Sequence, residues 1–210
     1  MRKSASFFAL LFTGMFSAAT QAAETSQFHF SGSEIVADFE SDTDCRVVTA
    51  HITFADGVNQ TAGKPTETPV LFADVFYSDA CMGPTMVFNG VVTAVQSASV
   101  RTDLAGASLV AVVPISDGAG TTINLTINLT FNATGDISST RDTYHSHDAG
   151  MVYNSRFNSS SRSGIATGVV SADFPTADGC ETINIAAAGS VDATAARNTN
   201  GDVIVVKKTK

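Results

Sequence analysis

Two of the four histidines in this chain stand one residue apart in the segment YHSHDAG, residues 144–150. On a β-strand this spacing directs the imidazoles of His145 and His147 to the same side, as zinc sites often require. The same pair also suits the polar side of a hairpin that binds nothing. The segment therefore predicts either a ligand site or a solvated hairpin face.

A two-residue turn at Ala149 and Gly150 would pair the flanking strands and decide which residues share a face. One face then gathers two histidines, two arginines and two other polar residues: Arg141, Thr143, His145, His147, Asn154 and Arg156. The other face gathers Tyr144, Met151, Tyr153 and Phe157, together with Asp148. A slip of one residue would exchange the faces of one strand relative to the other, so the prediction depends on this register.

Two guanidinium groups next to the histidines disfavour a metal cation, because like charges repel. Guanidinium groups instead bind anions through paired hydrogen-bond donors. A solvated polar face is therefore the preferred interpretation, while a site for an anion or an acidic sugar and a zinc site stay open as alternatives. The candidate ligand-binding residues are Arg141, His145, His147, Asn154, Arg156 and Arg162.

A second cluster is acidic and lies in the segment ADFESDTDC, residues 37–45. Calcium takes several oxygen ligands, and carboxylates at alternate positions can converge where a strand meets a loop. The glycine and the distal glutamate of an EF-hand loop are missing. A charged strand end that keeps a sheet edge soluble is the preferred interpretation. Calcium is the alternative, and it is the one cofactor that the sequence suggests. The candidate calcium ligands are Asp38, Glu40, Asp42 and Asp44.

Motifs for catalysis are scarce. The sequence has no Gly-x-Ser-x-Gly elbow, and no spacing ties a serine to a histidine. Jelly-roll polysaccharide lyases use Tyr, His and Arg on one concave sheet, but Tyr144 and Tyr153 fall opposite the histidines in the predicted register. We expect a non-catalytic protein. The alternative is an extracellular lyase or hydrolase that acts on a polysaccharide with His145, His147 and Arg156.

A glycan is a natural ligand for a secreted β-rich protein, but aromatic platforms are few. The chain has no Trp and three Tyr, and we expect its many Phe to pack mainly in the core. A glycan site would then be polar and lined by Asn and Thr. Asn-x-Ser/Thr sites would carry glycans themselves only in a eukaryotic secretory pathway; they begin at Asn59, Asn124, Asn128, Asn132 and Asn158.

The elements that position these residues are strands, because the dominant pattern has a period of two. In TTINLTINLTFNA, residues 121–133, apolar residues alternate with Asn and Thr, which is typical of an antiparallel sheet with one solvated side. The Asn and Thr would fill that wet side, or pair chains laterally. We expect strands at 27–39, 45–54, 69–78, 85–96, 108–115, 121–133, 136–147, 151–158, 162–174, 182–194 and 203–207.

Residues typical of turns separate some of these strands, so we expect turns at 55–57, 115–120, 133–136 and 198–202. No stretch combines sustained helical periodicity with proper caps. Many short strands in one domain predict an all-β fold, an antiparallel β-sandwich of jelly-roll type, with a closed barrel as the alternative.

The three cysteines suggest one disulfide and one leftover thiol in an oxidising compartment. Cys45 opens one expected strand, and Cys81 lies just past the end of the next. Antiparallel pairing of those strands would bring the two cysteines together, so we expect the Cys45–Cys81 bridge. Cys45–Cys180 is the rival pairing. Cys180 would otherwise be free or bonded to another chain.

The N-terminal residues have the three parts of a secretory signal peptide: basic Arg2 and Lys3, a short apolar run, and small residues before a cleavage point after Ala22. We expect a signal peptide over 1–22 and one domain over 23–210, secreted or periplasmic and without membrane insertion. Cleavage would change the net charge from −8 to −10, because two basic residues and no acidic ones are lost. Such acidity argues against nucleic acid, so the expected partners are a glycan or like subunits.

The segments DCRVVTAHITF, YSDACMGPTMVF and HSHDAGMVYNSRFNSSSRSGIATGVVS together resemble a loose group of secreted bacterial β-rich proteins of unknown function. The resemblance covers most of the mature chain and implies no activity. It implies that Cys45, Cys81 and the region from His145 to Arg162 are features shared by the group. Cys180 departs from the pattern, which fits an extra thiol.

Overall fold

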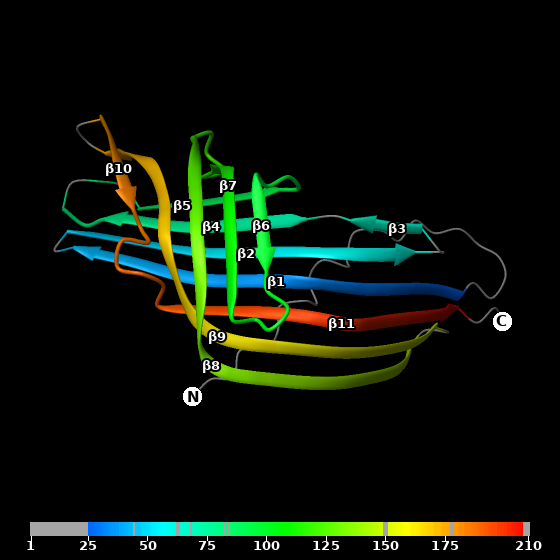
Figure 1. The fold of residues 1–210 in the computed structure, drawn as a ribbon. Helices are drawn as coiled ribbons and strands as arrows, with labels where there is room; N and C mark the ends of the chain where they lie inside the picture. The colour runs from blue at the N-terminus through cyan, green and yellow to red at the C-terminus, as the bar shows by residue number, and fades with distance from the viewer. Residues whose placement is uncertain are drawn as a thin grey trace.

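The computed structural model describes residues 25–43, 45–61, 64–67, 69–81, 83, 85–148, 151–176 and 179–207. The expected signal peptide, residues 1–22, lies outside them. Eleven strands make up the described part (Figure 1). They are β1 (Thr25–Thr43), β2 (Arg46–Thr61), β3 (Lys64–Glu67), β4 (Val70–Asp79), β5 (Thr85–Val92), β6 (Ser97–Val100), β7 (Gly106–Ser116), β8 (Thr122–Asp148), β9 (Met151–Thr176), β10 (Gly179–Asn184) and β11 (Asp192–Lys207). This part of the chain contains no helix that could cross a membrane.

All pairings between the described strands are antiparallel, and nine of the strands follow the order β1-β11-β9-β8-β7-β5-β4-β2-β3 in one sheet. Off this path, β10 pairs with β9 and β6 pairs with β7. β1 also pairs with β2, so the sheet closes on itself. The ring is thinnest between β5 and β7, which share the single pair Asn89 and Ser116. The all-β, antiparallel prediction is confirmed, while the jelly-roll sandwich stays a prediction.

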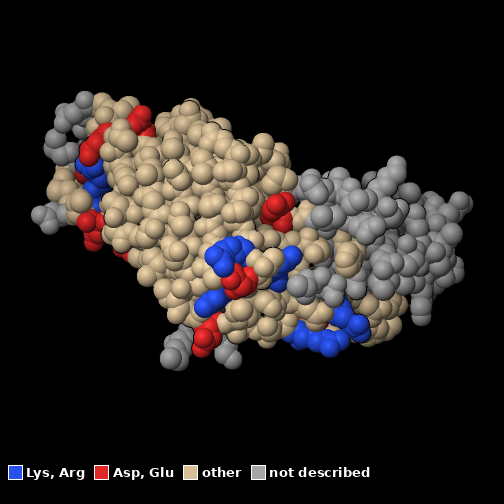
Figure 2. Space-filling view, viewed as in Figure 1, with Lys and Arg blue, Asp and Glu red and all other residues tan. Residues whose placement is uncertain are grey.

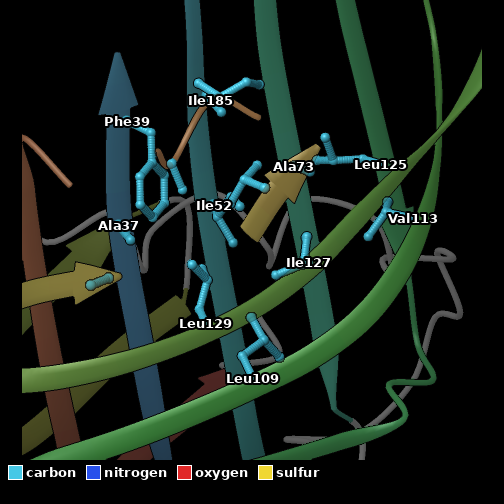
Figure 3. Packing of buried hydrophobic residues seen from close by; sticks show 14 of the residues in the cluster. Ala37, Phe39, Ile52, Ala73, Leu109, Val113, Leu125, Ile127, Leu129 and Ile185 are labelled. Carbon is cyan, nitrogen blue, oxygen red and sulfur yellow. The ribbon is translucent and has the colours of Figure 1, made fainter. Parts of the chain in front are cut away.

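The core lies inside this ring. β6, β7 and the first half of β8 cross in front of β1, β2 and β4 (Figure 1), and apolar side chains from both layers meet between them (Figure 3). Ile52 of β2, Leu125 of β8 and Val113 of β7 are fully buried there. Each such side chain contributes about 1.5–3 kcal/mol relative to an exposed one. The alternation in the sequence thus becomes an inner face and an outer face.

β8 and β9 are longer than the sequence predicted. The expected turn at 133–136 is instead a shift in the β8–β9 register between Ala133 and Ile137, so β8 is one continuous strand. The expected turns at 55–57 and 198–202 also lie inside strands, β2 and β11. These three predictions are wrong because turn residues are also tolerated at bulges and in exposed stretches of a strand. The turn at 115–120 is confirmed between β7 and β8.

Beyond the body, β8 and β9 continue as a hairpin that we call the β8–β9 arm, residues 137–148 paired with 151–162. β7 pairs with β8 only from Thr122 to Asn132. The side chains of β8 on the inner face are apolar up to Phe131, and on the same face of the arm they are polar from Ser139 onward. The face of the arm that carries Arg141, His145 and His147 is therefore an extension of the inner face of the body.

The disulfide joins Cys45 and Cys81, whose Cα atoms lie 5.3 Å apart. It forms where the start of β2 meets the end of β4, with Arg46 opposite Asp79 in the register. Ala80 N also donates to Cys45 O at 2.7 Å. Cys180 is exposed and free. The expected bridge is confirmed and the Cys45–Cys180 alternative is wrong.

Candidate functional site

The histidine hairpin has the predicted register. His147 lies opposite Val152, His145 opposite Asn154 and Thr143 opposite Arg156. The turn residues Ala149 and Gly150 themselves lie outside the described part of the chain. His145 Nδ1 forms a hydrogen bond with Asn154 Oδ1, and His145 Nε2 lies 2.9 Å from His147 Nε2. The two imidazoles therefore share a face, and they are hydrogen-bonded to each other.

The arginines of this face are not equivalent. Arg162 donates through Nε to Gly135 O at 2.7 Å, which ties it to the register shift at the base of the arm. Arg156 lies opposite Asp202 of β11 in the register. Arg141 borders a shallow depression of about 190 Å³. That depression is lined by Ser139, Thr140, Arg141, Asn158, Ser159 and Ser160, without either histidine.

The tyrosines lie on the other face, as predicted. The rings of Tyr144 and Tyr153 meet edge to face with centroids 5.8 Å apart. The Tyr, His and Arg side chains that the lyase alternative needs on one surface are therefore divided between two surfaces of the arm. The described residues include no group of three or more His, Cys, Asp or Glu side chains placed to hold a metal ion.

The acidic run lies within β1 rather than at a loop. Asp38, Glu40 and Asp42 occupy alternate positions and pair with His51, Thr49 and Val47 of β2. Alternate residues of a strand lie about 6.8 Å apart, too far for neighbouring carboxylates to share one ion without a bend. Asp44 lies outside the described residues. The calcium site stays a prediction.

Asp38 instead belongs to a row of polar residues that crosses four strands on the outer face of the body. In the register, Asp38 of β1 is beside His51 of β2, His51 is beside Asp74 of β4, and Asp74 is beside Asn89 of β5. His51 Nδ1 donates to Asp38 Oδ1 at 2.6 Å. His51 Nε2 lies 3.0 Å from Thr53 Oγ1. The ring is thus held at both nitrogens.

An aromatic side chain lies next to this row. Phe76 of β4 is 38% exposed, and its register partners are Thr49 of β2 and Val87 of β5. Together they border a depression of about 420 Å³. It is lined by Asp38, Phe39, Glu40, Thr49, Ala50, His51, Asp74, Phe76, Val87 and Val191, and we call it the His51 groove.

The His51 groove has a definite electrostatic character. Three carboxylates line it, from Asp38, Glu40 and Asp74, and its lining includes neither Lys nor Arg. Carboxylates and an imidazole can accept and donate hydrogen bonds, and the exposed ring of Phe76 offers an apolar surface beside them. The groove can therefore bind a molecule with both hydroxyl or ammonium groups and an apolar face.

The sequence analysis did not predict this groove, although the alternation in β2 and β4 places His51 and Phe76 on the outer face. The expectation that the phenylalanines pack in the core is wrong for Phe72 and Phe76, which are 36% and 38% exposed. In VLFADVFYSD, the residues Leu71, Ala73, Val75 and Tyr77 are buried, so the alternate ones face outward. The same alternation in β2 turns His51 outward. Which strands lie side by side was the missing information.

No protein-family model, curated protein or solved structure matches this chain. The resemblance to secreted bacterial β-rich proteins therefore stays a prediction.

Proposed function

We propose that the protein is a secreted, non-catalytic β-sandwich protein that binds a glycan in the His51 groove. One observation carries the proposal: an exposed aromatic ring, Phe76, lies beside a cross-strand row of hydrogen-bonding groups on an open sheet face. A sugar ring presents the same combination, an apolar face and a rim of hydroxyls. The Cys45–Cys81 disulfide supports an oxidising, extracytoplasmic setting.

The charge of the groove favours a neutral glycan or one that bears amino groups. Asp38, Glu40 and Asp74 would repel uronic acids and sulfated sugars. A protonated amine would instead gain charge-assisted hydrogen bonds from the same carboxylates. The front of the body, over β6, β7 and the first half of β8, carries few charged side chains (Figure 2).

A binding role fits the shape of the site better than catalysis does. The groove is an open depression on the outer face of a sheet, and enzymes that cleave glycosidic bonds enclose the bond between two carboxyl groups of distinct roles. Asp38 is hydrogen-bonded to His51. Its carboxylate thus orients the imidazole, which suits recognition.

A panel of neutral, amino-bearing and acidic polysaccharides tests the proposal by affinity electrophoresis and calorimetry. We expect the purified mature chain to bind a neutral or amino-bearing member. Phe76→Ala should weaken that binding about tenfold, because aromatic contacts of this kind contribute up to about 1.5 kcal/mol. Phe72→Ala is the matched control: Phe72 lies on the same strand with similar exposure but outside the groove.

Two outcomes would contradict the proposal. Equal loss of binding in the Phe72→Ala and Phe76→Ala variants would show that the His51 groove is not the binding site. Release of reducing ends or unsaturated products from any polysaccharide of the panel would show an enzyme instead.

A second candidate is an acidic glycan bound to the arm. It is favoured by the shared face of Arg141, Arg156 and the two histidines, and basic side chains gather along the lower side of the arm in Figure 2. Binding to an acidic polysaccharide that Arg141→Gln abolishes and Phe76→Ala leaves unchanged would select this alternative. Such binding should weaken steeply with salt.

A further inference from the structure

The two histidines of the β8–β9 arm bring two nitrogen ligands together. His145 Nε2 lies 2.9 Å from His147 Nε2, and both side chains are exposed. The two ring planes are inclined to each other by 81°. The ring centroids lie 4.7 Å apart, too close for the two rings to lie end to end on the line through both Nε2 atoms. Lone pairs in the ring planes can therefore converge on a point beside that line, where an ion from solvent can reach them.

A third residue fixes the tautomer of His145. Asn154 of β9 lies opposite His145 in the register, and its Oδ1 forms a hydrogen bond with His145 Nδ1. Because an amide oxygen only accepts, Nδ1 carries a proton and the neutral ring has its free lone pair on Nε2. Histidines that bind metal ions almost always have such a partner at their other nitrogen, and it orients the ring. His145 is thus arranged as a ligand.

We propose that His145 Nε2 and His147 Nε2 bind a divalent copper ion as neighbouring ligands. This site is separate from the His51 groove, and copper binding goes beyond the proposed glycan binding. Two nitrogen ligands at a right angle, as in a tetragonal Cu²⁺ site, are about 2.8 Å apart when both bonds are about 2.0 Å long. The observed separation is 2.9 Å.

The same comparison disfavours zinc. Tetrahedral bonds of similar length would separate the two nitrogen atoms by about 3.3 Å. Among divalent ions of the first transition row, Cu²⁺ also has the highest affinity for a given set of nitrogen ligands. The geometry and the affinity order therefore select the same ion.

Binding requires one proton to move. His147 Nε2 donates to His145 Nε2 in the structure, because the latter has the free lone pair. When the ion replaces this hydrogen bond, the proton passes through water to His147 Nδ1, and neither imidazole changes its charge. The described residues place no third His, Cys, Asp or Glu side chain with this pair. Water therefore fills the remaining coordination positions.

The arginines of this face lie nearer the body than the two ligands. Arg141 is four residues before His145 and borders the depression that neither histidine lines. Arg156 lies between Thr143 and Asp202 in the register. The net charge of the chain, −8, attracts cations. The repulsion expected from the sequence is therefore centred on the part of the arm that precedes the histidines.

Titration of the untagged mature chain with Cu²⁺ tests the proposal. The Cys180→Ser background is used, because the exposed thiol would itself bind and reduce Cu²⁺. We expect calorimetry to show a single equivalent bound, and electron paramagnetic resonance to show a tetragonal Cu²⁺ site with hyperfine splitting from two nitrogen atoms. His147→Gln should weaken binding at least about tenfold, because it removes one of the two ligands. His51→Gln, which removes an imidazole of the body, is the control and should leave the affinity for copper unchanged.

The thermal unfolding profile of His147→Gln should match that of the parent because His147 is exposed, so lost binding would not reflect lost folding. Equal copper affinity in His147→Gln and the parent would overturn the proposal, since the ion would then be adventitious only. A parent protein that binds no copper at micromolar concentration would also overturn it. A resonance spectrum with one nitrogen ligand would do the same, because the two imidazoles would then not share the ion.

Discussion

His51 Nδ1 lies 2.6 Å from Asp38 Oδ1 on the neighbouring strand, while its other ring nitrogen meets Thr53 Oγ1. The contact follows directly from the β1–β2 register, in which the two residues are opposed. Because a carboxylate can only accept, Nδ1 carries a proton and the tautomer is fixed. This relationship orients the imidazole at the border of the His51 groove.

Asp38→Asn should therefore affect binding more than folding. The two side chains are 42% and 43% exposed, and even a fully charged pair at such exposure contributes at most about 1 kcal/mol to the free energy of unfolding. We expect the free energy of unfolding, measured in urea, to change by less than about 1 kcal/mol. The affinity for the glycan of the groove should fall severalfold. Asp103→Asn, which breaks the exposed Arg101–Asp103 pair elsewhere, is the control and should leave affinity unchanged. A large loss of stability in Asp38→Asn would contradict this assignment.

Gly90→Ala should destabilise the fold where β5 meets β7, because these two strands share a single residue pair. A Cβ at Gly90 would lie 2.2 Å from the carbonyl oxygen of Pro114, so β5 and β7 would have to move apart. Overpacking of this kind costs about 1–3 kcal/mol. Urea unfolding would report the loss, and amide exchange should quicken first in β5 and β7.

Gly135→Ala is the matched control for that variant. A Cβ at Gly135 would have its nearest neighbour at 3.6 Å, an ordinary contact. Unchanged stability in both variants would mean that the β5–β7 contact does not limit the fold.

Local patterns predicted much of the fold. The alternation of apolar and polar residues predicted the inner face of β8, where Leu125, Ile127 and Leu129 are buried. The pairing expected from a two-residue turn predicted which residues share a face in the histidine hairpin. The disulfide followed from the order of two neighbouring strands. Each of these rests on residues close in the sequence, where a period of two and one turn fix the geometry.

The rest depends on pairings between distant strands, which alternation does not encode. The ring needs the pairing of β1 with β11, for example Ala37 with Ala193, as well as that of β1 with β2. The His51 groove exists because β1, β2, β4 and β5 are neighbours in one register. From the sequence, Asp38 was a candidate calcium ligand and His51 had no assigned role, because no local pattern predicts that these two residues are neighbours.

Removal of the disulfide should destabilise the body. Cys45 and Cys81 are 36 residues apart in sequence, and the bridge restricts the unfolded chain over that length. We expect the double variant Cys45→Ala/Cys81→Ala to lose about 2–4 kcal/mol of unfolding free energy. Reductant should destabilise the native chain similarly and leave the double variant unchanged. Cys180→Ser should unfold like the parent, and a comparable loss in that variant would show that Cys180 takes part in the fold.

Glu34→Gln should stabilise the protein at neutral pH. Burial raises the pKa of the Glu34 carboxyl above its ordinary value of 4.5, so the folded state favours the protonated form. The stability that this group contributes is fully present below about pH 4.5 and is lost as the pH rises through the raised pKa. Glutamine keeps the shape without the charge. We therefore expect the variant to melt at a higher temperature than the parent at pH 7, with the difference vanishing near pH 4. Glu40→Gln, an exposed position on the same strand, is the control, and a gain of equal size there would assign the effect to net charge rather than to burial of Glu34.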